Sequence, residues 1–150
     1  MIKIICIGKI KETFFRDAIE EYKKRISKYT KIEIVELMDY NYDDKKTIKE
    51  EFNSIMKVFN KNDYNILMDI SGDMIDSVTL SKKLESILTV NSNITFIIGG
   101  SLGTSDELRK ICNYRLSFSK MTFPHQLFRI ILLEQIYRSF KIINNEEYHK

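Results

Sequence analysis

Short β-branched segments alternate with segments whose apolar residues recur at helical spacing, and this alternation constrains the fold more than any other feature of the chain. Strands that alternate with helices build an α/β domain, with a largely parallel sheet covered by helices on both faces. We expect strands at Ile2–Ile7, Ile32–Met38, Tyr64–Ile70, Asn93–Ile98 and Arg115–Phe118. We expect helices at Thr13–Ser27, Asp43–Asn60, Thr79–Leu88, Thr104–Cys112 with Thr104 as the N-cap, and Pro124–Ile143.

Length and composition limit the class of protein. The 150 residues suit one domain over residues 1–150, and a hydrophobic content of 43% is enough for a core. No segment approaches the ~20 apolar residues of a membrane span, and Ile4–Ile7 is too short for a signal peptide. We therefore expect a cytoplasmic protein. Cys6 and Cys112 could form a disulfide or remain free thiols, as in a reducing cytosol, and no metal-ligand spacing is present.

Three predicted strands end in segments suited to binding a ligand. The third runs into Asp69 and Gly72, the fourth into Gly99-Gly100, and the fifth into Phe118–Phe123. Ligands of open α/β sheets bind at the carboxyl ends of the strands, and glycines let backbone approach a ligand closely. The glycine pattern is neither GxGxxG nor a Walker loop. The three segments predict a pocket with apolar walls, suited to an adenine ring and a thioether, although Gly99-Gly100 alone is equally typical of a turn.

The final predicted helix carries apolar residues on nearly every face. Such a helix must be buried on all sides. We therefore predict a homodimer through this helix; a central helix of the monomer core is the alternative.

Five polar residues near the end of the chain could take part in binding or chemistry. Arg129 lies among apolar residues and needs a partner, either a carboxylate such as Glu134 or an anionic ligand. His125 follows the only proline and is more typical of a structural histidine. Tyr148 and His149, with Lys150, combine a ring, an imidazole and an ammonium group, which suits stacking and phosphate contacts with a nucleic acid.

Positive charge is concentrated in one short segment. The net charge is +3, and five basic residues fall within nine positions, with two lysines upstream. The segment is either a solvated helix face or a surface that contacts phosphates. Its residues are Lys23, Lys24, Arg25, Lys28 and Lys31, with Lys9 and Lys11 upstream.

Several motifs together resemble the ribosomal RNA large subunit methyltransferase H family, small enzymes of the SPOUT class. The resemblance covers the whole chain, and its motifs are specific in combination rather than singly. They are Gly99-Gly100-Ser101-Leu102-Gly103, Leu116 to Gln126 (LSFSKMTFPHQ), Glu134-Gln135-Ile136-Tyr137-Arg138 and Tyr148-His149-Lys150.

The resemblance implies a SPOUT-type α/β fold with a C-terminal trefoil knot, a homodimer, and S-adenosylmethionine as methyl donor. It also implies methylation of N3 of a pseudouridine in large-subunit (23S) ribosomal RNA on assembled ribosomes. Met68 stands where we expect leucine in the family, a volume-conserving change, and Thr104 where leucine is common. By the family pattern, the cofactor contacts fall on Met68, Gly99, Phe118, Ser119, Lys120, Met121, Thr122 and Phe123.

Methyl transfer to a ring N–H requires a proton acceptor. We expect His149 to take the proton, because an imidazole has a pKa near ~6.5, and Tyr148 to act beside it. Arg129 could stabilise the developing base anion instead. A SPOUT methyltransferase for another RNA, or a non-catalytic ribosome-binding factor, would also fit the sequence. The short chain favours a substrate with a large surface of its own, such as the ribosome.

Overall fold

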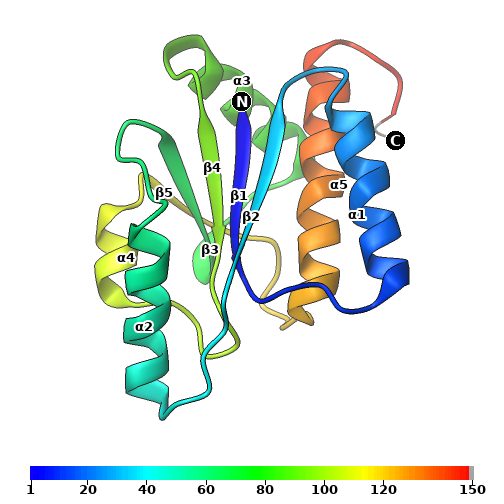
Figure 1. Ribbon diagram of the computed structural model, residues 1–150. Helices are drawn as coiled ribbons and strands as arrows, with labels where there is room; N and C mark the ends of the chain where they lie inside the picture. Colours follow the sequence, from blue (N-terminus) through cyan, green and yellow to red (C-terminus); the bar gives the residue numbers. More distant parts are fainter. Residues whose placement is uncertain (149–150) are drawn as a thin grey trace.

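The computed structural model describes residues 1–148, which form a five-stranded sheet with helices on both faces (Figure 1). All four strand pairings are parallel, in the order β2-β1-β4-β3-β5, so the predicted α/β class is confirmed. The strands are β1 (Ile2–Ile7), β2 (Ile32–Leu37), β3 (Tyr64–Met74), β4 (Ile94–Ile98) and β5 (Tyr114–Ser117). The helices are α1 (Thr13–Ile26), α2 (Asp44–Met56), α3 (Ser77–Val90), α4 (Asp106–Ile111) and α5 (His125–Ile143).

The helices divide the core into two layers. α1, α3 and α5 cover one face of the sheet, where α5 packs against both α1 and α3 (Figure 1). α2 and α4 cover the other face through a smaller cluster that includes Ile55 and Leu108. The central strand β4 is buried along its whole length, which explains its uninterrupted apolar sequence.

Several expected bounds differ by a few residues, and the extension of the third strand has an identifiable cause. The third strand continues to Met74 instead of ending at Ile70, because its pairing with β5 resumes after a register shift between Met68 and Asp73. Gly72 permits this close approach, since a Cβ there would lie 2.7 Å from the backbone of Arg115.

The capping of α4 is shifted by one residue. Ser105 is the N-cap and accepts a hydrogen bond from the Leu108 N–H at 3.2 Å, so the expected Thr104 cap was wrong. Gly103, at φ +86°, turns the chain just before this point. Thr104 instead packs against residues 99–103, which we call the glycine loop; a Cβ on Gly99 would lie 2.5 Å from the Thr104 methyl group.

The last helix is largely buried within the monomer. α5 lies between α1 and α3, with Leu132, Leu133 and Ile136 fully enclosed. Leu127 is 39% exposed, so part of the apolar surface remains open to a partner. No helix within residues 1–148 is both long and apolar enough to cross a membrane.

Candidate active site

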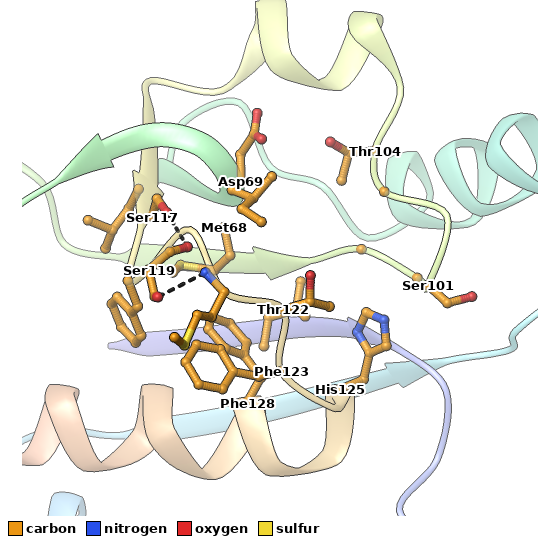
Figure 2. Close-up of a pocket in the computed structure, with 18 of the residues that line it drawn as sticks. Met68, Asp69, Ser101, Thr104, Ser117, Ser119, Thr122, Phe123, His125 and Phe128 are labelled. Atoms are coloured by element: carbon orange, nitrogen blue, oxygen red, sulfur yellow. Dashed lines mark hydrogen bonds between the residues drawn. The ribbon is translucent and has the colours of Figure 1, made fainter.

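A pocket of about 270 Å³ lies at the carboxyl ends of β4 and β5, beside the middle of β3 at Met68–Ile70 (Figure 2). Met68 and Gly99 line it, together with five of the six residues of Phe118–Phe123. Lys120 is exposed and does not line the pocket. The structure therefore brings together three segments that are distant in sequence, as the strand-end argument predicted.

Aromatic rings form one wall of this pocket. The Phe118 and Phe128 rings have centroids 5.4 Å apart, and the Phe123 and Phe128 rings have centroids 6.1 Å apart. Met68 contributes a nearly buried thioether on the sheet side. These walls give an apolar slot suited to a flat ring.

Hydroxyl and backbone groups shape the loop that closes the pocket. The Ser117 hydroxyl donates to the Ser119 carbonyl at 3.0 Å, and the Met121 N–H donates to the Ser119 hydroxyl at 3.0 Å (Figure 2). These two bonds fold residues 117–121 into a compact turn, which presents the Thr122 side chain to the pocket.

The glycine loop is held by a hydrogen bond to a buried carboxylate, that of Glu51. Glu51 of α2 is 5% exposed and accepts a hydrogen bond from the Gly100 N–H. Burial raises the pKa of Glu51, and Asp39 adds to the rise, while the Gly100 bond opposes it. A Cβ on Gly100 would lie 2.5 Å from the Glu51 carboxylate, so a larger residue at position 100 would displace this carboxylate. The Gly103 N–H closes the turn by donating to the Gly100 carbonyl at 3.1 Å.

Asp69 organises a charged network at the pocket edge. It accepts hydrogen bonds from the Ser71 N–H (3.0 Å) and hydroxyl (2.9 Å), and from the guanidinium groups of Arg109 (3.1 Å) and Arg115 (3.4 Å). Burial opposes ionisation of Asp69, but these four donors outweigh it and hold its pKa below the ordinary value. The network joins β3, α4 and β5.

Arg129 is 3% exposed and has a partner that the sequence did not indicate. Its Nη1 donates to Glu36 of β2 at 2.6 Å, and its Nη2 donates to the Gly8 carbonyl at 3.2 Å. The expected partner Glu134 is wrong, because Glu134 pairs with Arg138 at 2.8 Å. Arg129 does not line the pocket beside Met68 and Gly99 but lines a neighbouring cavity.

Among residues 1–148, His125 is the histidine that lines the pocket. It is half-buried, and burial followed by the positive charge of Arg129 lowers its pKa, so its imidazole is neutral at pH 7. A neutral imidazole carries one donor and one acceptor nitrogen.

The structure does not bring Tyr148 to the pocket of its own chain. Its hydroxyl donates to Glu134 at 3.2 Å, and its ring packs edge-on against Tyr137 at 5.1 Å. Glu134 lies nine residues beyond His125 along α5, which corresponds to about 14 Å. His149 and Lys150 lie outside the described residues.

Sequence reasoning missed two acidic residues near the site, Glu51 and Glu36, and only Glu51 has a recognisable signal in the sequence. Glu51 lies between Ile48 and Ile55 at helical spacing, on the stripe that faces the core. Glu36 alternates with apolar residues in an ordinary strand pattern, and nothing local distinguishes it from a solvated residue.

Other site types receive no support from the described chain. Among residues 1–148, no group of three or more His, Cys, Asp or Glu side chains is placed to hold a metal ion. Cys6 is buried and Cys112 is half-buried, and both are free thiols.

Comparisons with known proteins give one consistent result. The family described as "Predicted SPOUT methyltransferase" matches residues 1–149. Ribosomal RNA large subunit methyltransferase H of Clostridium botulinum (strain Okra) is 50% identical, with 99% of each chain covered. Ribosomal RNA large subunit methyltransferase H 1 of Clostridium perfringens (strain SM101) is 49% identical, again over 99% of each chain.

A solved structure supports the fold independently. A probable methylase family protein from Haemophilus influenzae superposes with a TM-score of 0.57 at 14% identity, covering 99% of this chain and 70% of that one.

Proposed function

The chain belongs to the SPOUT methyltransferase family, and we propose that it transfers a methyl group from S-adenosylmethionine to N3 of a pseudouridine in 23S ribosomal RNA. The full-length similarity to large-subunit methyltransferase H relatives, at about half of all positions, is the observation that carries this proposal. We further propose that the substrate is the assembled ribosome and that the protein acts in the cytoplasm as a single domain.

The residues of the pocket fit S-adenosylmethionine. Met68, Phe118 and Phe123 provide apolar walls for an adenine ring, and Ser119 and Thr122 provide hydroxyl groups for the polar parts of the molecule. Lys120, which is exposed, would contribute through its backbone only. When bound, this cofactor supplies a methyl group on a positively charged sulfur.

The contribution of the chain to the reaction is placement and proton transfer. Gly99 and Met121, which both line the pocket, would contact the donor, and holding reacting atoms about 3 Å apart supplies much of the acceleration. Met68, Gly99, Phe118 and Phe123 would hold the cofactor, which would supply its methyl group to the acceptor nitrogen and leave as a neutral thioether. The N–H proton of the base would pass to the His149 imidazole. In the alternative, the Arg129 charge would stabilise the base anion from the neighbouring cavity, where Arg129 is paired with Glu36.

A homodimer through α5 would complete the site. Tyr148 packs against Tyr137 and Glu134 of α5 and does not line the pocket of its own chain, so the terminal residues would serve the pocket of a second subunit. The exposed Leu127 side chain offers apolar contact surface on the same helix. We also propose that the segment after β5 forms the trefoil knot implied by the family resemblance.

The test is transfer of a labelled methyl group from S-adenosylmethionine to assembled ribosomes, free 23S RNA and bulk transfer RNA in parallel. Label on ribosomes alone, mapping to a pseudouridine, is the expected result. Label on free RNA or transfer RNA alone would refute the ribosomal substrate. Cofactor binding without label on any substrate would refute the acceptor, and an absence of cofactor binding would favour a non-catalytic ribosome-binding factor.

A further inference from the structure

Helix α2 places one charged side chain in the interior of the protein. Its buried face carries Thr47, Glu51 and Ile55, and Glu51 is 5% exposed. Within residues 1–148 the Glu51 carboxylate forms no ion pair. A buried carboxylate without a counter-ion lowers the stability of a fold. Packing of α2 on the sheet therefore gives no reason for an acid at this position.

The contact that this carboxylate makes is with the glycine loop. Glu51 accepts a hydrogen bond from the Gly100 N–H, and both of its oxygens lie within 2.6 Å of the position that a Gly100 Cβ would take. The carboxylate thus occupies the space that a side chain at position 100 would fill. The Gly103 N–H donates to the Gly100 carbonyl at 3.1 Å. Gly100 is therefore held at its N–H by Glu51 and at its carbonyl by Gly103.

Glu51 reaches the cofactor pocket only through this loop. Gly99, Gly100 and Gly103 line the pocket, whereas Glu51 does not. A trans peptide holds its N–H and its carbonyl on opposite sides, and residues 1–148 contain no cis peptide bond. The bond from the Gly100 N–H to Glu51 therefore directs the Gly99 carbonyl away from Glu51. Because Gly99 lines the pocket, Glu51 fixes the direction of the carbonyl of a pocket residue.

We propose that Glu51 is a positioning residue for methyl transfer, which holds the glycine loop in the shape that binds S-adenosylmethionine. The carboxylate orients the Gly99–Gly100 peptide before the cofactor arrives, so binding does not have to order the loop first. Glu51 itself does not touch the cofactor. This inference rests on the proposed function, because it assigns the support of the donor pocket for the same reaction.

Binding of S-adenosylmethionine to the full chain, measured by calorimetry, tests this role without relying on activity. Glu51→Leu removes the acceptor and should weaken binding about tenfold, the value of one lost hydrogen bond to a charged group. Glu51→Gln keeps an oxygen that can accept from the Gly100 N–H, and its affinity should return to within about threefold of the wild type. Glu50→Gln changes the neighbouring acid of α2, which lines none of the three cavities near the loop, and should bind as the wild type does.

Stability measurements separate positioning from a structural role. Glu51→Leu removes a buried charge and leaves the half-buried Gly100 N–H within reach of water, so the urea midpoint should not fall. Equal affinity of Glu51→Leu and the wild type would overturn the proposal. A fall in the midpoint in proportion to the loss of affinity would also overturn it, as would a Glu51→Gln variant that binds as weakly as Glu51→Leu.

The Gly100 amide gives a second measurement that does not depend on the leucine variant. In nuclear magnetic resonance spectra of the ¹⁵N-labelled wild type, this amide should shift as Glu51 ionises, with a midpoint above 4.5, because burial and then Asp39 raise the pKa of Glu51. The step should vanish in Glu51→Gln, which distinguishes it from the titration of neighbouring groups. An amide that does not titrate, or a step that persists in Glu51→Gln, would overturn the proposal. The neighbouring groups, which line the adjoining cavity with Glu51, are Lys9 and Lys11 after β1, Asp39 and Tyr40 after β2, and His125 and Arg129 of α5.

The two proposals fail in different ways. If the wild-type protein does not bind S-adenosylmethionine, the proposed function fails. If the wild type binds it and Glu51→Leu binds it equally well, only the assignment of Glu51 fails.

Discussion

The buried ion pair between Arg129 and Glu36 joins α5 to the end of β2, and Arg129→Met tests its contribution to stability. Methionine replaces the unbranched aliphatic part of the arginine side chain but has no guanidinium group. The substitution therefore removes the bonds to Glu36 (2.6 Å) and to the Gly8 carbonyl (3.2 Å). Glu36 would still accept a hydrogen bond from the Ile10 N–H at 3.0 Å.

The expected loss in free energy of unfolding depends on how much of each partner in the ion pair is buried. Breaking a buried ion pair costs about 3–5 kcal/mol when the remaining charge has no access to water. The Glu36 side chain is 35% exposed, so water can rehydrate it, and the Arg129 Nε has no bond to lose. We therefore expect Arg129→Met to lower the free energy of unfolding by about 2–3 kcal/mol. Glu36→Gln should cost about 3 kcal/mol, because it leaves a buried cation without its counter-ion (Arg129 is 3% exposed).

Urea unfolding at a fixed protein concentration measures these differences. With a slope of about 2 kcal/mol per molar urea, Arg129→Met should lower the midpoint by about 1 M. The double variant should lose about 1–2 kcal/mol less than the sum of the single variants, since each single change already breaks the pair. Additive losses would refute the ion pair as the source of the effect.

Four further predictions address the rest of the molecule. Deleting Tyr148–Lys150 should leave S-adenosylmethionine affinity unchanged, as measured by calorimetry, and abolish methyl transfer; full turnover by the shortened protein would contradict the proposed role of these residues. Lys24 and Lys28 are exposed, and the double variant Lys24→Glu with Lys28→Glu should raise the apparent Kd for the ribosome. It should also reduce the slope of log affinity against log salt concentration by roughly 0.7–0.9 for each phosphate that the variant no longer neutralises. An unchanged slope would argue against this surface. The lowered pKa of Asp69 means that its ionised form stabilises the fold above the ordinary value of 3.8, and that this stabilisation is lost as the pH falls through the lower folded value. The stability difference between wild type and Asp69→Asn should therefore shrink in strong acid, and a constant difference would count against the network. Burial raises the pKa of the Cys6 thiol to about 12, so mass spectrometry should detect alkylation of Cys6 only under unfolding conditions; rapid labelling of the native protein would contradict its burial.

The sequence predicted the local elements well where the signal was local. The first strand has the predicted bounds, Ile2–Ile7, because a β-branched run closed by Gly8 fixes both ends. The pocket was predicted because the carboxyl ends of parallel strands share one edge of the sheet, and Gly99 and Phe118–Phe123 mark two of those ends. Both inferences need only short-range pattern and a general rule of topology.

The parts that could not be predicted depend on contacts between distant residues. Arg129 finds Glu36, 93 positions away, and no local pattern specifies that pairing. The third strand extends beyond Ile70 only because β5 lies beside it, with Gly72 at the point of close approach. Thr104 and Ser105 are both capable N-caps, and the choice between them depends on how the chain leaves Gly103.

The strand order also imposes a sequence of events on folding. β1 lies between β2 and β4, and Ile2 pairs with both Ile32 and Ile94. During synthesis, the inner edge of β1 therefore has no partner until residues 94–98 have been added. An unpaired, apolar edge can pair with another chain, so this interval is the period of greatest risk of aggregation. Parallel pairing between strands that are far apart in sequence is also slow. The inner edge of β1 therefore stays exposed until β4 pairs with it.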